Sequence, residues 1–283
     1  MRVRSFSLIN EYGQEYGLNN AGARGLLTDP QGLGYSFSVN YIDIGDAFIR
    51  TKKKAKQGMI SGTLIFGSNK PYELYAKFSE FIRGSRELRL IYRTPGSSVS
   101  YYRDVDLVKV EKTEIEESVL KCPVEFYCNS LFYSNTRNNF TVSSVKGELR
   151  YDITWPARYN DYSERTILLS NTGDVDAPFT LVLQGYCENP TVTLSKDGKV
   201  VASIKFPLIL QADEKILYSS LDDNLYVYHQ DAEGNKTNII QMLNINYENF
   251  FKVPQGDYSM SFTSDTGAAY TTSLVLYKFY RTV

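Results

Sequence analysis

The sequence has few of the residues that carry most enzymatic chemistry. It contains one histidine, His229, among 283 residues, and it has no G-x-S-x-G, Walker A or G-x-G-x-x-G motif. A Ser-His-Asp or Cys-His centre would have to use that single histidine, and no nucleophile motif lies near it. We therefore interpret His229 as an ordinary residue near the end of a strand and predict no catalytic residue and no enzymatic activity.

Cysteine is also scarce, with only Cys122, Cys128 and Cys187. An odd, small number favours reduced thiols that pack as small apolar side chains in a protein made in a cytosol. Together with one distant histidine they do not supply the roughly four paired ligands of a zinc site. Acidic pairs such as Asp104 with Asp106 would share one side of an extended chain. Calcium needs more oxygen ligands than these, so we predict no metal and no cofactor.

Neither an excess of one charge nor a long hydrophobic run is present. The 31 basic and 32 acidic residues give a net charge of −1, which argues against nucleic-acid binding through overall charge. No apolar run approaches the ~18 residues of a membrane span, and the start, MRVRSFSLINEYG, lacks the apolar region of a signal peptide. We expect no membrane partner, no secretion and no sequence-specific nucleic-acid partner.

Tyrosine and phenylalanine are abundant instead, at 23 and 15 residues. Both favour strands, and tyrosine also suits wet interfaces. Residues 35–42 alternate apolar and polar side chains, which predicts a strand. Residues 71–83 form the one convincing helical pattern, with Asn69 as a cap and Gly84 as a left-handed end. The basic run that follows the first strand is interpreted as an exposed or interface loop, because no aromatic residues for base stacking interleave it; it comprises Lys52, Lys53, Lys54 and Lys56.

The second half contains strands and turns only. The segment NTGDVDAPFTLVLQG, residues 171–185, predicts a turn followed by a buried strand over 179–183. The turn at 196–199, KDGK, is a strong two-residue hairpin signal. Strands spaced by roughly 8 to 12 residues indicate a β-sandwich or jelly roll. We place a domain boundary near residue 134, which gives an N-terminal β-domain with one helix (1–134) and a C-terminal β-sandwich (135–283).

Several phrases, taken in order, resemble the distal tail protein family of long-tailed phages that infect Gram-positive bacteria. The first half carries GTLIFGSNKPYELYAKFSEFIRGSRELRLIY (62–92), YYRDVDLVKVEKTEI and KCPVEFYCNSLFY. The second half carries NTGDVDAPFTLVLQGYCENPTVTL, ADEKILYSS and VPQGDYSMSFTS. Each phrase is weak alone, but their order and spacing together are fairly specific. The segment KKKAK departs from the more basic or arginine-containing segment that family members often have.

The resemblance implies an N-terminal ring-forming β-domain and a galectin-like or carbohydrate-module-like β-sandwich. It also implies a virion protein of the tail tip, assembled in the bacterial cytoplasm as a ring, with six copies expected. Its implied partners are itself, the tail tube protein, the tail-associated fibre or hub protein and receptor-binding proteins. We expect the ring contacts on the basic run at 52–56 and on the hairpin around 94–112, including Tyr101, Tyr102 and Arg103.

Two other functions remain open from the residues. A carbohydrate-binding module could use an aromatic platform made of Trp155, Tyr159 and Tyr162. A β-sandwich hydrolase could use two carboxylates on one side of a strand. The first alternative predicts glycan binding that depends on Trp155, and the second predicts turnover of a polysaccharide that is lost when one aspartate is removed.

Overall fold

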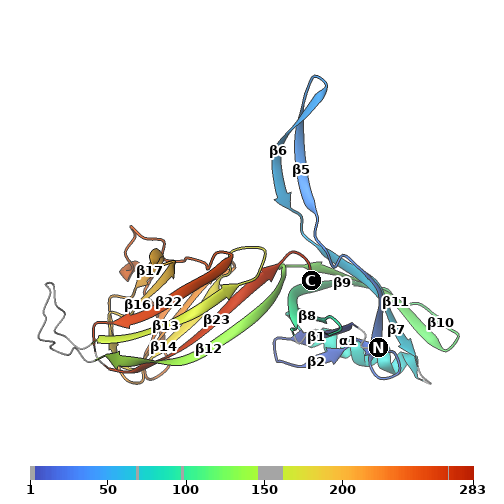
Figure 1. The fold of residues 1–283 in the computed structure, drawn as a ribbon. Helices are drawn as coiled ribbons and strands as arrows, with labels where there is room; N and C mark the ends of the chain where they lie inside the picture. Colours follow the sequence, from blue (N-terminus) through green and yellow to red (C-terminus); the bar gives the residue numbers. More distant parts are fainter. Residues whose placement is uncertain (1–3, 68–69, 97–98, 146–161, 267) are drawn as a thin grey trace, which may run out of the picture. The chain divides into compact units, whose positions relative to one another are not determined.

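The computed structural model describes residues 4–67, 70–96, 99–145, 162–266 and 268–283. The chain divides into two compact units. The first contains the described residues up to Ser134 together with Tyr280–Val283, and the second contains Asn135–Phe279. Both are built almost entirely of antiparallel strands (Figure 1), so the prediction of a mainly β protein with one helix in the first unit and a β-sandwich in the second is confirmed.

The first unit is a curled antiparallel sheet in the order β2-β1-β8-β9-β11-β7-β4-β3. The sheet curls because Leu18, between β2 and β3, donates to the carbonyl of Phe6 at 2.9 Å and accepts from the amide of Leu27 at 3.0 Å. The strands are β1 (Ser5–Asn10), β2 (Glu15–Gly17), β3 (Asn19–Asn20), β4 (Gly25–Gln31), β7 (Met59–Gly67), β8 (Leu88–Arg93), β9 (Tyr101–Val110), β10 (Ile115–Glu116) and β11 (Val119–Cys128).

Helix α1 (Pro71–Arg83) covers part of this sheet, as the apolar spacing predicts. Its buried face is aromatic: the ring of Phe78 lies 5.8 Å from Phe66 of β7 and 5.5 Å from Tyr16 of β2. Pro71 begins the helix, where its missing N–H costs nothing. Asn69, the predicted cap, lies outside the described residues. The prediction for Gly84 is wrong, because its φ of −79° is right-handed and the helix ends without a left-handed residue.

The second unit is a sandwich of two sheets around one core. One sheet has the order β12-β23-β14-β19-β20-β21, and the other contains β13, β22, β16 and β17. The strands are β12 (Phe132–Val145), β13 (Tyr162–Asn171), β14 (Phe179–Gln184), β16 (Thr191–Lys196), β17 (Lys199–Lys205), β19 (Lys215–Leu221), β20 (Asn224–Gln230), β21 (Lys236–Asn238), β22 (Gly256–Ser264) and β23 (Tyr270–Tyr280), with the short pair β15 (Cys187–Glu188) and β18 (Ile209–Leu210) and a 3-10 turn at Ile240–Met242.

The sandwich core confirms the period-two patterns of the sequence. Phe179, Leu181 and Leu183 of β14 are buried and alternate with more exposed residues, as the phrase FTLVL predicts. The ring of Phe179 lies 5.2 Å from Tyr218 and 5.3 Å from Phe251. The turn between β16 and β17 is also as predicted, since Asp197 and Gly198 both have positive φ, 50° and 76°.

Candidate functional site: an exposed hairpin and an acidic edge

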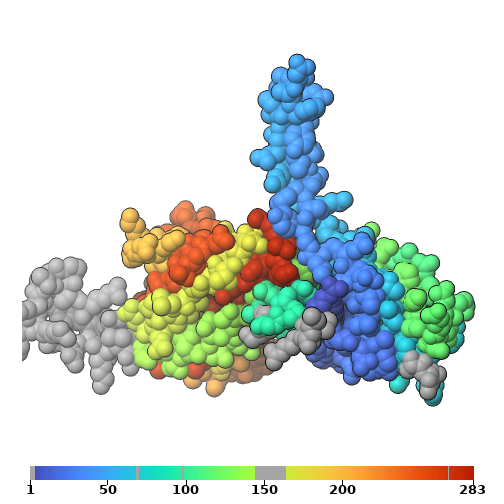
Figure 2. All heavy atoms as spheres, turned by 45° about the vertical axis from the view of Figure 1, so that its right-hand side comes forward, coloured from blue at the N-terminus to red at the C-terminus, as the bar shows by residue number. Residues whose placement is uncertain are grey.

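The most unusual element of the first unit is a two-stranded hairpin formed by β5 (Phe37–Ile44) and β6 (Ala47–Ala55). These strands pair with each other only. Every residue of β6 is exposed, and most of β5 is exposed as well. Figures 1 and 2 show the hairpin standing away from the rest of its own unit. The alternating pattern at 35–42 therefore does form a strand, but among the described residues of its own unit no other strand pairs with the hairpin.

The basic run is part of this hairpin. Lys52, Lys53 and Lys54 lie on β6, and Lys56 follows it, so their interpretation as a loop is wrong, while their exposure is confirmed. The strand tolerates consecutive lysines because both of its faces meet water. The ammonium of Lys53 lies 4.0 Å from the centre of the Phe37 ring, a cation–π contact on one face of the hairpin.

The two faces of the hairpin differ in chemistry, because residues paired across an antiparallel ladder share a face. One face has an aliphatic tip, made of the pairs Ile42–Ile49 and Ile44–Ala47. The isoleucines of this tip are between 52% and 56% exposed. Towards the base, the same face carries the pairs Ser38–Lys54 and Asn40–Lys52. We call this surface the isoleucine face; the opposite face carries Tyr41, Phe48, Arg50 and Lys53.

A second surface of the first unit has the opposite charge. Residues 106–117, from the end of β9 through β10, contain five acidic and two basic side chains, a net −3. The hairpin region 35–56 contains five basic and two acidic side chains, a net +3. Two exposed aliphatic residues, Val108 and Ile115, lie among these acids, at 48% and 37% exposure. We call residues 106–117 the acidic edge.

The acidic edge is braced by local contacts. Lys109 pairs with Glu111 at 3.2 Å and with Glu125 at 3.7 Å, and these carboxylates raise the pKa of Lys109. The hydroxyl of Tyr72 on α1 donates to Glu114 at 3.2 Å. Such exposed ion pairs contribute little to stability, so the acids of this edge remain available to a partner of positive charge.

The other predicted interface residues lie on β9 and are less exposed. Tyr101 packs edge-on against Tyr280, with ring centres 5.4 Å apart, and Tyr102 stacks on Tyr133 at 5.8 Å. Arg103 is only 4% exposed, and burial lowers its pKa. The contact of these three residues with another copy stays a prediction, and for Arg103 its burial argues against it.

Among the residues that the structure describes, those considered for other functions do not converge on one site. His229 is the second-last residue of β20, and its Nε2 lies 3.1 Å from Oε2 of Glu214. The pKa of Glu214 is lowered, first by the hydrogen bond from the backbone N–H of Gln211 and then by His229. Within the described ranges, no group of three His, Cys, Asp or Glu residues is placed to hold a metal ion. Trp155 and Tyr159 lie outside the described residues, as does the side chain of Tyr162.

Burial separates the three cysteines from any surface chemistry. Cys122 and Cys187 are fully buried and Cys128 is 4% exposed, and all three are free thiols. Burial raises the pKa of each thiol, and it raises that of Cys187 to about 12.

Among the described residues, no helix has both the length and the apolar character needed to cross a membrane.

Solved structures similar to this chain identify its fold. A chain of the phage P2 baseplate in its activated conformation with Ca aligns over 100% of both chains, with a TM-score of 0.62 and 14% identity. The same baseplate with Sr gives 0.62 and 15%. The SPP1 Dit protein, described as a paradigm of hub adsorption apparatus in Gram-positive infecting phages, aligns over 96% of this chain and 98% of its own, with a TM-score of 0.59 and 14% identity. The fold is therefore that of phage baseplate and hub proteins.

The sequence itself supports a more specific statement. Residues 5–129 match the family model described as "Distal tail protein, N-terminal domain". This part of the chain therefore carries a distal tail protein N-terminal domain, and the resemblance inferred from the sequence is confirmed. No curated protein sequence matches the chain.

Proposed function

We propose that copies of this chain assemble head to tail into a closed ring of six at the tip of a phage tail. The ring joins the tail tube to the tail fibre or hub protein and anchors receptor-binding proteins. Its role is architectural and requires no reaction. The distal tail domain over residues 5–129 and the full-length likeness to hub proteins support this function. The observation that carries the ring is the uncovered β5–β6 hairpin.

The hairpin is poorly explained as part of an isolated monomer. A two-stranded hairpin alone is marginally stable in water, and its aliphatic tip keeps Ile42, Ile44 and Ile49 more than half exposed. Burying such a side chain fully stabilises by roughly 1.5–3 kcal/mol relative to leaving it exposed. A partner that covers the isoleucine face would therefore gain several kcal/mol and would also order the hairpin.

We propose that the partner is the acidic edge of the next copy. The two surfaces match in kind: an aliphatic tip beside lysines meets two exposed aliphatic residues, Val108 and Ile115, among acids. They are different surfaces of the same unit, so the contact is heterologous. Repeated contacts of this type close a ring when the rotation between copies closes, and otherwise build a filament. This arrangement uses the predicted segment 52–56 and only the end, residues 106–112, of the predicted segment 94–112; it does not use Tyr101, Tyr102 or Arg103.

The test measures the mass of the purified chain in solution over a range of concentrations, alone and mixed with the tail tube protein. Light scattering on a sizing column and negative-stain images are expected to reveal a ring. The double substitution Ile42→Ser with Ile49→Ser is expected to abolish it. Phe48→Ser is the matched control, because Phe48 is 72% exposed on the opposite face of the hairpin.

Two results would contradict this proposal. A chain that stays monomeric at the highest soluble concentration and with the tail tube protein would remove the ring. If the ring forms equally well with both isoleucines replaced, the chain does form a ring, but the hairpin does not form its contact. Circular dichroism of each variant shows that the fold is retained, since neither isoleucine belongs to the buried core.

A further inference from the structure

The face of the β5–β6 hairpin opposite the isoleucine face takes no part in the ring contact proposed above. It carries Phe37, Tyr41 and Phe48, and the ring of Tyr35, just before β5, packs edge-on against Phe37 with centres 5.3 Å apart. Tyr35, Tyr41 and Phe48 are each more than half exposed, and Phe48 is 72% exposed. We call this surface the aromatic face. Large exposed apolar groups gathered on one surface mark an interaction site.

Each cation of the aromatic face lies beside one of its rings. Arg50 is paired across the ladder with Tyr41, and the ammonium of Lys53 lies 4.0 Å from the centre of the Phe37 ring. Lys53 and Arg50 are paired with residues two apart on β5, so they lie roughly 7 Å apart along the hairpin. Asp43 is the one acid on this face of the hairpin. The surface therefore alternates rings with positive charges and keeps a positive excess.

Pairing of the two strands creates this alternation. No aromatic residue stands within the basic run 52–56 of the sequence, which was the reason to interpret the run without base stacking. In the folded hairpin β5 supplies most of the rings and β6 supplies the cations, and the register places them side by side. The reason drawn from the sequence therefore does not hold for the hairpin.

A surface that alternates rings and cations suits a chain that alternates flat groups and negative charges. Single-stranded nucleic acid has this chemistry, because its bases stack on aromatic side chains while cations follow its phosphates. Arginine beside a ring adds a cation–π contribution. A duplex keeps its bases stacked on one another, so it could use the cations alone. An acidic protein segment would likewise leave the rings without a partner.

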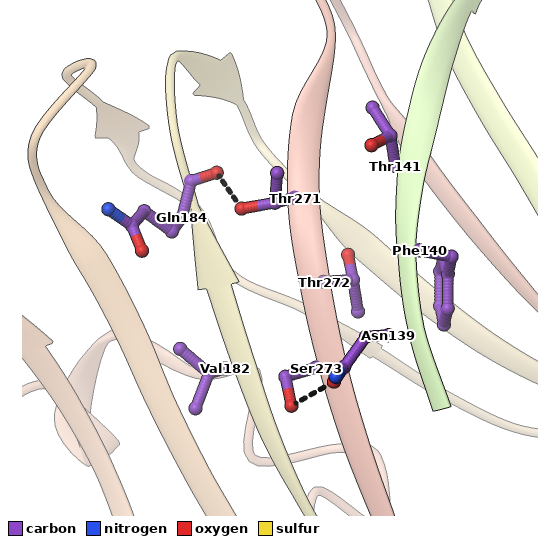
Figure 3. A pocket seen from close by; sticks show the side chains of 8 residues that line it. All are labelled: Asn139, Phe140, Thr141, Val182, Gln184, Thr271, Thr272 and Ser273. Carbon is purple, nitrogen blue, oxygen red and sulfur yellow. Dashed lines mark hydrogen bonds between the residues drawn. The ribbon is translucent and has the colours of Figure 1, made fainter. Parts of the chain in front are cut away.

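The hollow that β12, β14 and β23 form on the second unit has a different chemistry (Figure 3). None of the described side chains that line it is charged. Its polar groups partly satisfy one another: Ser273 donates to Asn139 at 2.7 Å, and Thr271 donates to the carbonyl of Gln184 at 3.2 Å. The hollow therefore does not combine rings with cations as the hairpin does.

We propose that the aromatic face of the hairpin binds single-stranded nucleic acid without reading its base sequence. Bases stack on Tyr41 and Phe48, and phosphates contact Arg50 and Lys53. This activity goes beyond the architectural role of the ring. It does not rest on the ring, because the ring contact uses the opposite face of the hairpin.

The test titrates a fluorescein-labelled oligothymidylate of about twelve nucleotides, within the site sizes of such surfaces, with the full-length protein and follows fluorescence anisotropy. Binding is expected at low salt, and it is expected to be tighter than that of a duplex of the same length or of polyglutamate. Tyr41→Ala with Phe48→Ala is expected to weaken it by about thirtyfold or more, because two stacked bases are lost. Tyr12→Ala with Tyr247→Ala is the matched control, since both tyrosines are more than 60% exposed outside the hairpin, and it is expected to leave binding unchanged.

Salt dependence tests the cations. Each phosphate contact with a single strand contributes about 0.7 to the slope of log affinity against log salt concentration. Arg50→Gln with Lys53→Gln is therefore expected to reduce that slope by about 1.4. Lys52→Gln with Lys54→Gln makes the same charge change on the isoleucine face and is expected to reduce it less.

One further variant separates this proposal from the ring. Ile42→Ser with Ile49→Ser, which is expected to abolish the ring, is expected to bind the short oligonucleotide as the unsubstituted chain does. Three results would overturn the proposal: no binding of the oligonucleotide at low salt, equal binding of the duplex or of polyglutamate, or full binding by the Tyr41→Ala, Phe48→Ala variant. Circular dichroism of each variant shows that the fold is retained.

Discussion

Gly58 lies so close to the guanidinium of Arg103 that no side chain fits between them. A Cβ at Gly58 would overlap Nη2 of Arg103 and lie 3.5 Å from Cβ of Cys128. Arg103 is held in place by a 3.0 Å hydrogen bond from its Nε to the carbonyl of Ser130, and its guanidinium lies 4.8 Å from the centre of the Phe132 ring. The chain that leaves the exposed hairpin therefore enters the sheet directly over a buried cation.

The first prediction concerns this close approach. Gly58→Ala is expected to destabilise the first unit by about 1–3 kcal/mol, the usual cost of overpacking, because Arg103 is surrounded and cannot move freely. Urea unfolding monitored by tyrosine fluorescence measures the change. Gly34→Ala is the control, since a Cβ there meets nothing within 4 Å and its φ is not positive. If the two variants are equally stable, the Arg103 side chain moves aside with no loss in the free energy of unfolding.

The second prediction concerns Asn171, the first residue of the phrase NTGD. Its side chain is 1% exposed and makes three hydrogen bonds of 2.9 Å: Nδ2 donates to the carbonyls of Val175 and Val253, and Oδ1 accepts from the amide of Gly173. Asn171→Ala leaves the buried amide of Gly173 unpaired, at roughly 1–3 kcal/mol, and removes two further hydrogen bonds, each worth about 1 kcal/mol. The carbonyl of Val253 still accepts from the amide of Ala177 at 2.8 Å. We expect a loss of at least about 3 kcal/mol in the stability of the second unit.

Exposed asparagine provides the control for this prediction. Asn224, the first residue of β20, is exposed, so Asn224→Ala is expected to change the urea midpoint little. If Asn171→Ala unfolds at the same urea concentration as Asn224→Ala, water satisfies the groups that Asn171 now satisfies. The role of the turn as an organiser of the strand that follows would then be wrong.

Local chemistry explains which elements the sequence could predict. The helix at 71–83 and the turn at Asp197–Gly198 follow from apolar spacing and turn residues within a few positions. The role of Asn171 was not predictable, because one of its acceptors, the carbonyl of Val253, is 82 residues away. Sequence could assign the phrase to a turn but could not show what the asparagine binds.

The candidate sites show a different limit. Alternation at 35–42 indicates which side chains share a face, but it does not tell whether anything covers that face. For this reason the strand was predictable but the exposure of most of its residues was not, and the lysines of β6 were interpreted as a loop.

The third prediction concerns alkaline pH. Burial raises the pKa of Cys187 to about 12 from a usual value near 9. Above about pH 9 the unfolded chain loses this proton while the folded chain keeps it, so the folded state binds more protons and stability falls as pH rises. The loss grows by at most about 1.4 kcal/mol per pH unit and continues until pH reaches the folded value.

Urea unfolding of the second unit at pH 8, 9, 10 and 11 measures this slope. Cys187→Ala lowers stability at every pH because it leaves a cavity, but it also removes the titrating group. Its stability is therefore expected to fall less steeply between pH 9 and 11 than that of the unsubstituted chain. If the stability of the two proteins falls equally steeply with pH, the Cys187 thiol is not the group that causes the pH dependence.

The fourth prediction uses the opposite charges of the isoleucine face and the acidic edge. Lys52→Glu with Lys54→Glu reverses the charge beside the aliphatic tip, and Glu116→Lys with Glu117→Lys reverses it on the edge. Each pair alone places like charges together and is expected to prevent assembly at low salt. All four substitutions in one chain restore opposite charges across every contact and are expected to restore assembly, since each copy supplies both surfaces. Restoration distinguishes a direct contact from two separate defects. It is measured by solution mass at several ionic strengths, because salt screens exposed charges.

Arg50→Glu with Lys53→Glu is the control, because it makes the same charge change on the opposite face of the hairpin and is expected to weaken assembly less. If the fourfold variant stays monomeric while its fold is intact, the hairpin does not dock on residues 106–117.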